Sequence, residues 1–203
     1  DHLLDARLVS YDVRGSIAHA EMLAATGLIS DEDAGAIRDG LRQLEASFEA
    51  GEWSITLEDE DVHTALETRL THSIGDAGGR LHLGRSRNDQ VLTALRLYLL
   101  DAADDLGARV DRLRESVARL ADRQGEIPLP GYTHMQQAMP SSVALWCGGF
   151  DEAFADARDG IGSAKRRMDK NPLGTAAGYG TPGLPLDREM TTASLGFGAT
   201  QTP

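Results

Sequence analysis

Two short polar segments contain the residue types that could bind and transform an anionic small molecule. Residues 84–90 read GRSRNDQ, and residues 130–136, which begin 40 positions after Gln90, read PGYTHMQ. Arginine, asparagine and serine side chains donate hydrogen bonds to carboxylates, and an arginine can donate two in parallel. Folding alone gives no reason to concentrate these residues in seven positions. The two segments therefore predict a site for a carboxylate-rich substrate.

His134 is the candidate acid or base of the second segment. Pro130 and Gly131 before it, and Pro140 after it, restrict the backbone of the connection in which it lies. Histidine suits proton transfer because it titrates near neutral pH. Thr133 beside it could donate a hydrogen bond to a substrate carboxylate. On spacing alone, a surface or capping histidine and a threonine that satisfies its own turn remain open as alternatives.

Ser86 and Asn88 stand where a long helix is expected to begin, and both are good N-cap residues. Capping does not exclude binding, because a helix N-terminus is itself a site for anions. Earlier in the chain, residues 59–63 read DEDVH. Acidic residues in a first helical turn favour the helix dipole, and His63 could form a surface pair with Glu67 four positions later.

Helical spacing of apolar residues dominates the chain and strand patterns are nearly absent, which predicts an all-α fold. We expect helices over about residues 5–26, from Ser30 to Gly51, from 59–61 to Gly75, over 88–124 and over 141–168. An N-terminal helical domain is expected at residues 1–83. Residues 84–203 are expected to form the first part of a central bundle of long helices.

The helix predicted over residues 88–124 has a functional consequence. At roughly 1.5 Å per residue it is a rod of about 55 Å. Asn88 lies at the start of this rod and His134 lies beyond its other end, so one copy of the chain cannot bring them together. If both serve one site, antiparallel copies must place the start of one rod beside the end of another.

The two segments resemble the SRNDQ and PGYTH signatures of the argininosuccinate lyases, in the fumarase/aspartase superfamily. Residues 172–178, PLGTAAG, followed by LDRE at residues 186–189, resemble a third conserved region of that family in the same order. The resemblance implies reversible β-elimination of argininosuccinate to arginine and fumarate, in arginine biosynthesis. It also implies a homotetramer, built around a central bundle of long helices, in which three subunits contribute to each active site.

The resemblance also implies a role for each candidate residue. His134 matches the histidine assigned to acid/base work. The residues that match contacts to the substrate carboxylates and their surroundings are Ser86, Arg87, Asn88 and Thr133. The residues that match contacts to the arginine-like half of the substrate are Asp5, Asp61 and His63.

Composition limits the other classes of function. The net charge of −12 argues against nucleic acid as a partner, because binding phosphates needs clustered lysine and arginine. No apolar run approaches the roughly 20 residues of a membrane span, and the first residues do not resemble a secretion signal. A single cysteine, Cys147, fits a reducing compartment and is expected to be a small buried hydrophobe. These features predict a cytoplasmic protein with no membrane partner.

No cofactor or metal is expected. The histidines show no metal-ligand spacing such as HExxH. The glycines within residues 174–180 follow no predicted strand and precede no Gly-Lys-Ser/Thr, so they do not predict a nucleotide loop. We expect them to let the backbone approach a substrate or a neighbouring subunit closely.

One departure from the family pattern concerns a mobile loop of the form GSSxMPxKxNP, which carries the serine favoured as the base. This loop is not in the 203 residues, so the chain is expected to be the first half of the enzyme and a poor catalyst alone. Three alternatives remain: another superfamily enzyme such as adenylosuccinate lyase, aspartase or fumarase; a lyase for acylated argininosuccinate; and a non-catalytic structural bundle like the lens crystallins.

Overall fold

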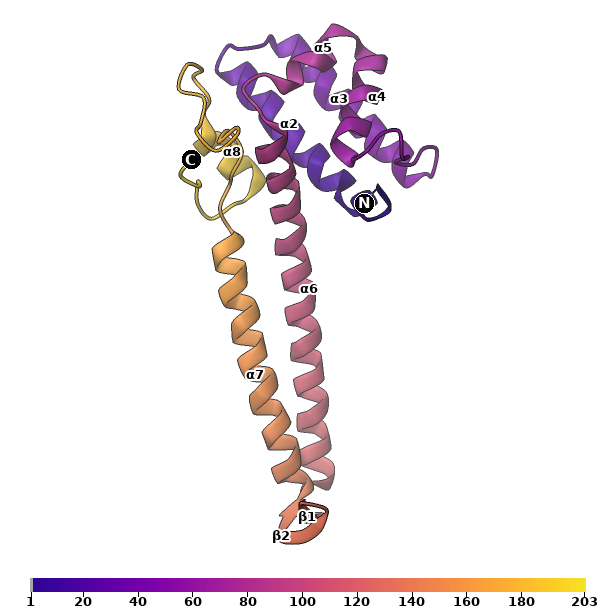
Figure 1. Ribbon diagram of the computed structural model, residues 1–203, viewed down its shortest axis with the longest axis vertical. Coiled ribbons are helices and arrows are strands. Elements are labelled where there is room, and N and C mark those ends of the chain that lie inside the picture. The colour runs from indigo at the N-terminus through magenta and orange to yellow at the C-terminus, as the bar shows by residue number, and fades with distance from the viewer. Residues whose placement is uncertain (1) are drawn as a thin grey trace. The chain divides into compact units, whose positions relative to one another are not determined.

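The computed structural model describes residues 2–203 and is built from helices with one small β-hairpin (Figure 1). In chain order the elements are α1 (His2–Asp5), a 3-10 turn η1 (Ala6–Leu8), α2 (Val9–Ala25), α3 (Asp31–Glu49), α4 (Val62–Ile74), α5 (Asp76–Gly79), η2 (Arg80–His82), α6 (Arg87–Gln124), β1 (Pro128–Thr133), β2 (Gln136–Ser142), α7 (Val143–Met168) and α8 (Arg188–Leu195). The predicted all-α class is confirmed. The hairpin and α8 were not predicted.

The helices begin and end where local chemistry requires it. Ser30 caps α3, because its hydroxyl accepts a hydrogen bond from the Asp33 backbone N–H at 3.1 Å. Asp61 caps α4 in the same way through the Thr64 N–H at 2.7 Å. Gly75 follows α4 with a positive φ of 69°, a conformation that glycine adopts without the penalty of a side chain.

Two compact units make up the chain. The first contains the chain up to Leu99 together with Asp169–Pro203, and the second is Leu100–Met168. The division falls inside α6, whereas the domain boundary expected from the sequence lies between residues 83 and 84. That domain assignment stays a prediction.

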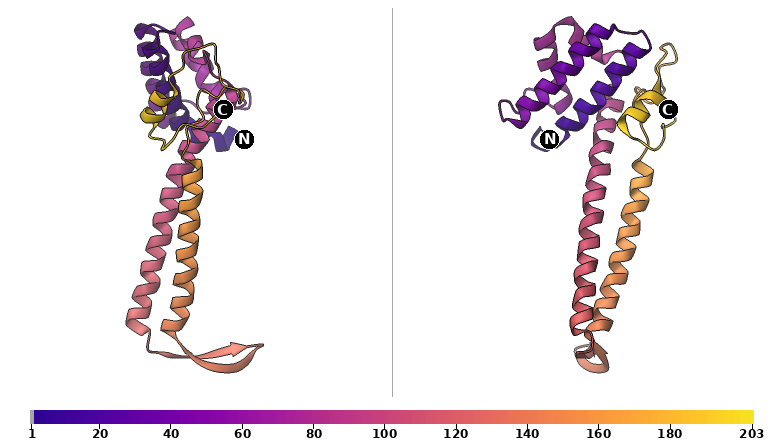
Figure 2. Two further views of the ribbon diagram at one scale, coloured as in Figure 1. Left: turned by 90° about the vertical axis from the view of Figure 1, so that its left-hand side faces the viewer. Right: turned by 180° about the vertical axis from the view of Figure 1, so that it is seen from behind.

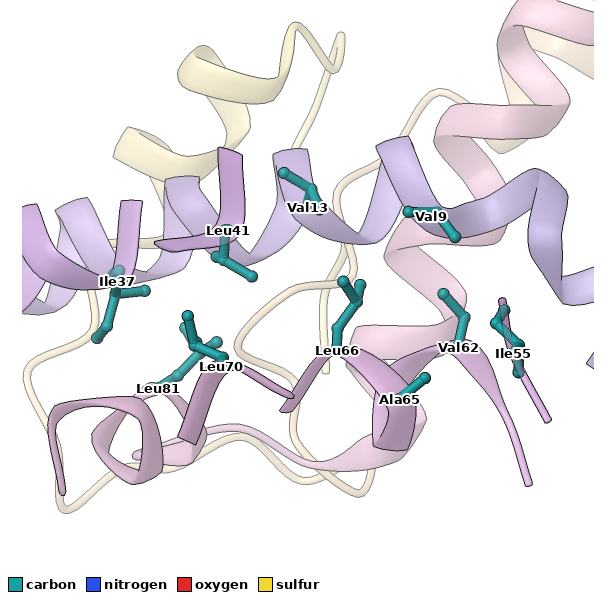
Figure 3. Close-up of a cluster of buried hydrophobic side chains, with 11 residues drawn as sticks. Val9, Val13, Ile37, Leu41, Ile55, Val62, Ala65, Leu66, Leu70 and Leu81 are labelled. Carbon is teal, nitrogen blue, oxygen red and sulfur yellow. The ribbon is translucent and has the colours of Figure 1, made fainter. Parts of the chain in front are cut away.

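The apolar core of the first unit lies between α2, α3 and α4 (Figure 3). Its fully buried side chains recur at helical spacing on each element, as expected for stripes that face one another. The cluster consists of Val9, Val13, Ala20, Ile37, Leu41, Ile55, Val62, Ala65, Leu66, Leu70 and Leu81. Burying one leucine side chain contributes roughly 1.5–3 kcal/mol, so this cluster is what fixes α4 against its neighbours.

In the second unit, α7 runs antiparallel to the second part of α6, and the hairpin joins them (Figures 1 and 2). Arg114 donates two hydrogen bonds to Asp151, and Arg158 donates one to Asp111 at 3.1 Å. These partly exposed ion pairs each contribute little, so they set the register of the two helices more than their stability. Cys147 on α7 is 1% exposed, which confirms its expected burial.

The hairpin pairs β1 with β2 antiparallel, with Thr133 opposite Gln136 and an irregularity between Pro130 and Tyr132. Gly131 lies at this irregularity, where a Cβ atom would clash with the Met139 carbonyl oxygen. The close approach of the two strands therefore requires glycine. Among the helices of residues 2–203, none is long and apolar enough to cross a membrane.

The core predicts a stability difference between two leucines. Leu70 is 0% exposed and Leu57 is 76% exposed. We expect Leu70→Ala to lower the free energy of unfolding by about 2–5 kcal/mol, because the substitution leaves a cavity. Leu57→Ala should change it by less than about 0.5 kcal/mol. Urea unfolding followed by circular dichroism measures both, and equal midpoints would contradict the packing described above.

Candidate functional site

The polar segment at residues 84–90 divides into an inward and an outward half. Its buried side chains are Arg85, Asp89 and Gln90, which are 7%, 1% and 3% exposed. Its partly or fully exposed side chains are Ser86, Arg87 and Asn88. The division follows from helix geometry, since the segment enters the first turn of α6, where successive side chains point about 100° apart. One half can hold the segment while the other remains available to a ligand.

Ser86 caps the N-terminus of α6. Its Oγ accepts hydrogen bonds from the Asn88 backbone N–H at 3.3 Å and from the Asn88 side-chain amide at 3.2 Å. Asp89 accepts in return from the Ser86 backbone N–H at 2.9 Å, which completes a reciprocal capping arrangement. The capping role expected of Ser86 is therefore confirmed, and its partly exposed side chain stands at the positive end of a 38-residue helix.

Arg87 links this helix end to α4. Its Nη1 donates to both carboxylate oxygens of Asp61, at 2.9 and 3.3 Å, and to the Thr64 hydroxyl at 2.9 Å. Its Nη2 lies 3.8 Å from Glu67 Oε2. Arg87 and Asp61 keep 39% and 33% of their side chains exposed, so both remain accessible.

An open pocket of about 420 Å³ lies beside this ion pair. It is lined by Thr64, Glu67, Thr68, Thr71, His72 and Arg87. Hydroxyls, a carboxylate and a guanidinium therefore surround one concave surface, which suits a ligand with both positive and negative groups.

Asp5 lies next to the same helix start. Its Oδ2 accepts a weak hydrogen bond of 3.4 Å from the Val62 backbone N–H, one residue after Asp61. Two carboxylates thus converge on the first turn of α4 from segments 56 positions apart in the sequence. The structure brings together Asp5, Asp61, Ser86, Arg87 and Asn88 as a linked group on the first unit.

His63 is buried, and the surface pair with Glu67 that its spacing suggested is wrong. Its side chain is 2% exposed and its Nδ1 lies 3.1 Å from Asp12 Oδ1, which is equally buried. Glu67 lies instead near Arg87 and His82. The α4 turn that starts at Asp61 therefore points His63 into the protein, toward α2.

Asp12 is the acceptor at the centre of this buried cluster. Gln90 Nε2 donates to its two carboxylate oxygens at 3.0 and 3.2 Å. Burial by itself would raise the pKa of Asp12, but the favourable interactions with His63, Arg85 and Gln90 outweigh it and hold the pKa below its usual value. Arg85, whose Nη1 donates to Ser16 at 2.9 Å, has a pKa lowered by burial.

His19 completes the buried polar group. It is 0% exposed, and its Nε2 lies 2.8 Å from the Leu83 carbonyl oxygen. Burial, with a smaller contribution from the charge of Arg85, lowers the pKa of His19 to about 3. The imidazole is therefore neutral near pH 7, and its Nε2–H donates to Leu83.

Thr133 and His134 belong to the second unit and lie at the end of the hairpin. His134 and Met135 form its two-residue turn, with φ angles of 51° and 64°. Positive φ at both central positions is the signature of a type I′ turn, whose twist matches that of the flanking strands. Thr133, His134 and Met135 are exposed, Met135 at 96%. Among residues 2–203 no hydrogen bond fixes the His134 side chain.

Sequence reasoning gave no role to Asp12, Asp89 or Gln90, although the last two lie within the polar segment. Asp12 pairs with His63 and Gln90, and Asp89 accepts from Gly174, all more than 50 positions away in the sequence, and no local pattern encodes such pairs. Among the described residues, no group of three or more histidine, cysteine, aspartate or glutamate side chains could hold a metal ion.

Comparison with known proteins gives consistent results. A family model described as lyase matches residues 1–202. A curated argininosuccinate lyase of Sorangium cellulosum (strain So ce56) is 47% identical over 197 residues, which are 97% of this chain and 46% of that protein. One of Xanthomonas axonopodis pv. citri (strain 306) is 44% identical over 197 residues, 97% of this chain and 45% of that protein. The chain spans just under half the length of these relatives.

A solved structure supports the fold. An EDDS lyase variant with bound fumarate superposes with a TM-score of 0.85 at 30% sequence identity, over 97% of this chain and 38% of that one. The likeness extends over nearly every element described above.

Burial of His19 predicts how stability depends on pH. Because the folded pKa of about 3 lies below the usual 6.5, the unfolded chain binds the proton first, and stability is lost as pH falls from 6.5 toward 3. The loss approaches about 1.4 kcal/mol per pH unit. We expect His19→Gln to lose about 2 kcal/mol less than the parent protein between pH 6.5 and 5. Denaturant titrations at both pH values measure this, and parallel losses would show that His19 does not titrate as described.

Proposed function

The chain belongs to the lyase family whose model matches residues 1–202, and on that premise we propose that the protein containing it is an argininosuccinate lyase. The proposed reaction is the reversible β-elimination of argininosuccinate to arginine and fumarate, in cytoplasmic arginine biosynthesis. Support comes from the two relatives of that name at 44–47% identity over 97% of the chain. The bound fumarate in the EDDS lyase variant is a second point of support.

The observation that carries the proposal is the linked group at the start of α6. Argininosuccinate has carboxylates and a guanidinium-like group, so its site needs donors and acceptors side by side. Ser86 and Asn88 stand at the positive end of α6, where a carboxylate is favoured. Asp61 and Asp5 offer carboxylates to the arginine-like half a short distance away. Arg87 lies between the two sets, and its contact with Asp61 holds it there before substrate binds.

In the proposed mechanism, a base removes a proton from the carbon next to a substrate carboxylate. The carbanion electrons delocalise into that carboxylate, which becomes doubly negative. They then form the double bond of fumarate as the bond to the guanidino nitrogen breaks, and protonation of that nitrogen completes arginine. The step that costs most free energy is the one that gives the carboxylate its extra negative charge. Fixed donors at Ser86, Arg87 and Asn88 stabilise it without reorganising.

His134 and Thr133 take the remaining roles in this proposal: His134 in proton transfer and Thr133 as a donor to a substrate carboxylate. His63 is proposed to support the arginine-like half from its buried position against Asp12 rather than by reaching into solvent. The exposed hairpin turn that presents His134 is consistent with a residue that completes a site on another copy of the chain.

Assembly of several copies is part of the proposal. The 38-residue α6 is about 57 Å long; the first polar segment runs into its first turn and the second follows its end. Within the second unit, α6 and α7 leave large apolar side chains exposed: Leu106, Leu113, Leu145, Trp146 and Phe150. Large apolar side chains left exposed on a pair of packed helices are typical of an interface. We propose a homotetramer whose central bundle covers these side chains and whose active sites are shared between subunits.

The decisive experiment adds argininosuccinate to the full-length protein and follows fumarate release by its ultraviolet absorbance. We expect release by the parent protein and a loss of about 100-fold or more in His134→Asn, because general acid–base catalysis contributes that much. The oligomer mass, measured by light scattering, should not change. Asparagine is the suitable replacement since it tolerates positive φ.

Other results of this assay would contradict parts of the proposal. Unchanged turnover in His134→Asn would remove the catalytic assignment. No fumarate from argininosuccinate, but release from an acylated form, would shift the substrate. No release from either would favour the structural-bundle alternative.

The assembly proposal predicts the effect of a charge on α7. Trp146 is 55% exposed in the single chain, and a homotetramer would bury it. Trp146→Asp should therefore lower the oligomer mass at micromolar concentration, because burying an unpaired carboxylate is costly. Leu57→Asp, which places the same charge at an exposed leucine of the first unit, is the matched control. Equal masses for all three proteins would contradict the proposed interface.

A further inference from the structure

Asp89 is a buried carboxylate that accepts hydrogen bonds from two separate segments of backbone. Its Oδ1 accepts from the Ser86 N–H at 2.9 Å. Its Oδ2 accepts from the Gly174 N–H at 2.9 Å and from the Ala176 N–H at 2.8 Å. The side chain is 1% exposed. One side chain therefore joins the outward-facing residues at the start of α6 to a loop 85 positions later in the chain.

Three backbone donors are what a buried carboxylate needs. A charge removed from water is costly unless it is paired and hydrogen-bonded, and hydrogen bonds to an ionised acceptor are about twice as strong as neutral ones. Asp89 also interacts favourably with the charges of Arg85 and Arg188. Replacing the carboxylate by an amide would turn one acceptor into a donor that faces N–H groups.

The loop at residues 174–180, called here the glycine loop, adopts backbone conformations that residues other than glycine disfavour. Gly174, Gly178 and Gly180 have φ angles of 85°, 108° and 71°, and Ala176 has 51°. Positive φ is unfavourable for alanine, and glycine loses the most conformational freedom when it is fixed. Two backbone hydrogen bonds of 2.9 Å to the Thr175 carbonyl, from the Gly178 and Gly180 N–H groups, close the loop on itself. Its position against the rest of the unit depends on contacts from outside the loop.

The base of the glycine loop is held by two side chains of the same unit. Arg188 Nε donates to the Leu173 carbonyl at 2.8 Å, and its Nη2 donates to the Gln201 carbonyl at 2.7 Å. Asn171, which is 0% exposed, accepts from the Leu173 N–H at 3.0 Å. These contacts end before the loop itself. The contacts that fix Gly174 and Ala176 toward the start of α6 are those to Asp89.

We propose that Asp89 is a positioning residue that holds Ser86 and Asn88 in register with the glycine loop, so that this loop forms a second wall of the same substrate site. The inference rests on the proposed function, since it assigns the loop to the site for the carboxylate half of the substrate. It also explains why a polar signature contains a side chain that no substrate can reach.

The direct test measures amide hydrogen exchange in the full-length protein. We expect the Gly174 and Ala176 amides to exchange at least tenfold faster in Asp89→Asn than in the parent. Asp187→Asn is the matched control: Asp187 caps α8 through the Met190 N–H at 2.9 Å in the same segment but joins no second loop. Unchanged exchange at Gly174 and Ala176 in Asp89→Asn would overturn the proposal.

Kinetics separate positioning from a general loss of structure. In Asp89→Asn we expect KM for argininosuccinate to rise and kcat per folded site to fall, so that kcat/KM falls at least tenfold, because Ser86 and Asn88 are proposed both to bind the carboxylate and to stabilise its extra charge. Both constants should be unchanged in Asp187→Asn. A variant that is only less folded would lose active enzyme and keep KM, which would overturn the positioning role.

A measurement on the parent protein covers the case in which Asp89→Asn does not fold. Saturating fumarate should slow exchange in both residues 84–90 and residues 174–180. Slowing confined to residues 84–90 would overturn the second-wall assignment. The two proposals fail separately: without fumarate release from argininosuccinate the proposed function fails, whereas the exchange contrast between the two variants still tests the Asp89 contacts.

Discussion

The candidate site depends on the cost of burying charge beneath the first turn of α6. Arg85, Asp89 and Gln90 are each nearly inaccessible to water, so each needs partners supplied by the fold. Arg85 donates to Ser16, Gln90 donates to Asp12, and Asp89 accepts from three backbone groups. These contacts fix the rotation of α6 about its axis. The side chains between them therefore point away from the interior; they are Ser86, Arg87 and Asn88.

The elements that the sequence predicted well are those with a local cause. Ser30 and Asp61 cap helices through their own side chains, Gly75 ends α4 with a positive φ, and α6 and α7 begin within two residues of the expected positions. The hairpin was missed because its turn is His134-Met135 rather than a pair rich in glycine or asparagine. Three prolines in its strands further hide the strand pattern. The energy that holds these residues at positive φ comes from strand pairing, which a single segment does not reveal.

In the candidate site too, contacts between residues close in the sequence could be predicted and long-range contacts could not. Ser86 and Asn88 share one helix start, so their mutual contact follows from spacing. The contact between His63 and Asp12 joins positions 51 residues apart, and only the packing of α4 against α2 brings them together. Spacing pointed to Glu67 instead, because a helix pattern offers as partners only the neighbours three or four positions away. Pairs of buried polar groups that are far apart in the sequence cannot be predicted from spacing and become visible only in the structure.

Cys147 can serve as a probe of local opening in the second unit. It is the one thiol in the sequence and is 1% exposed on α7. A thiol reagent can reach it only when the surrounding helices open, and reaction requires the thiolate at the surface. The rate of labelling therefore reports the frequency of local opening in this unit, at a position far along the chain from every candidate contact at the start of α6. Since no second thiol competes within these 203 residues, labelling of this chain is assigned to Cys147 without mutagenesis.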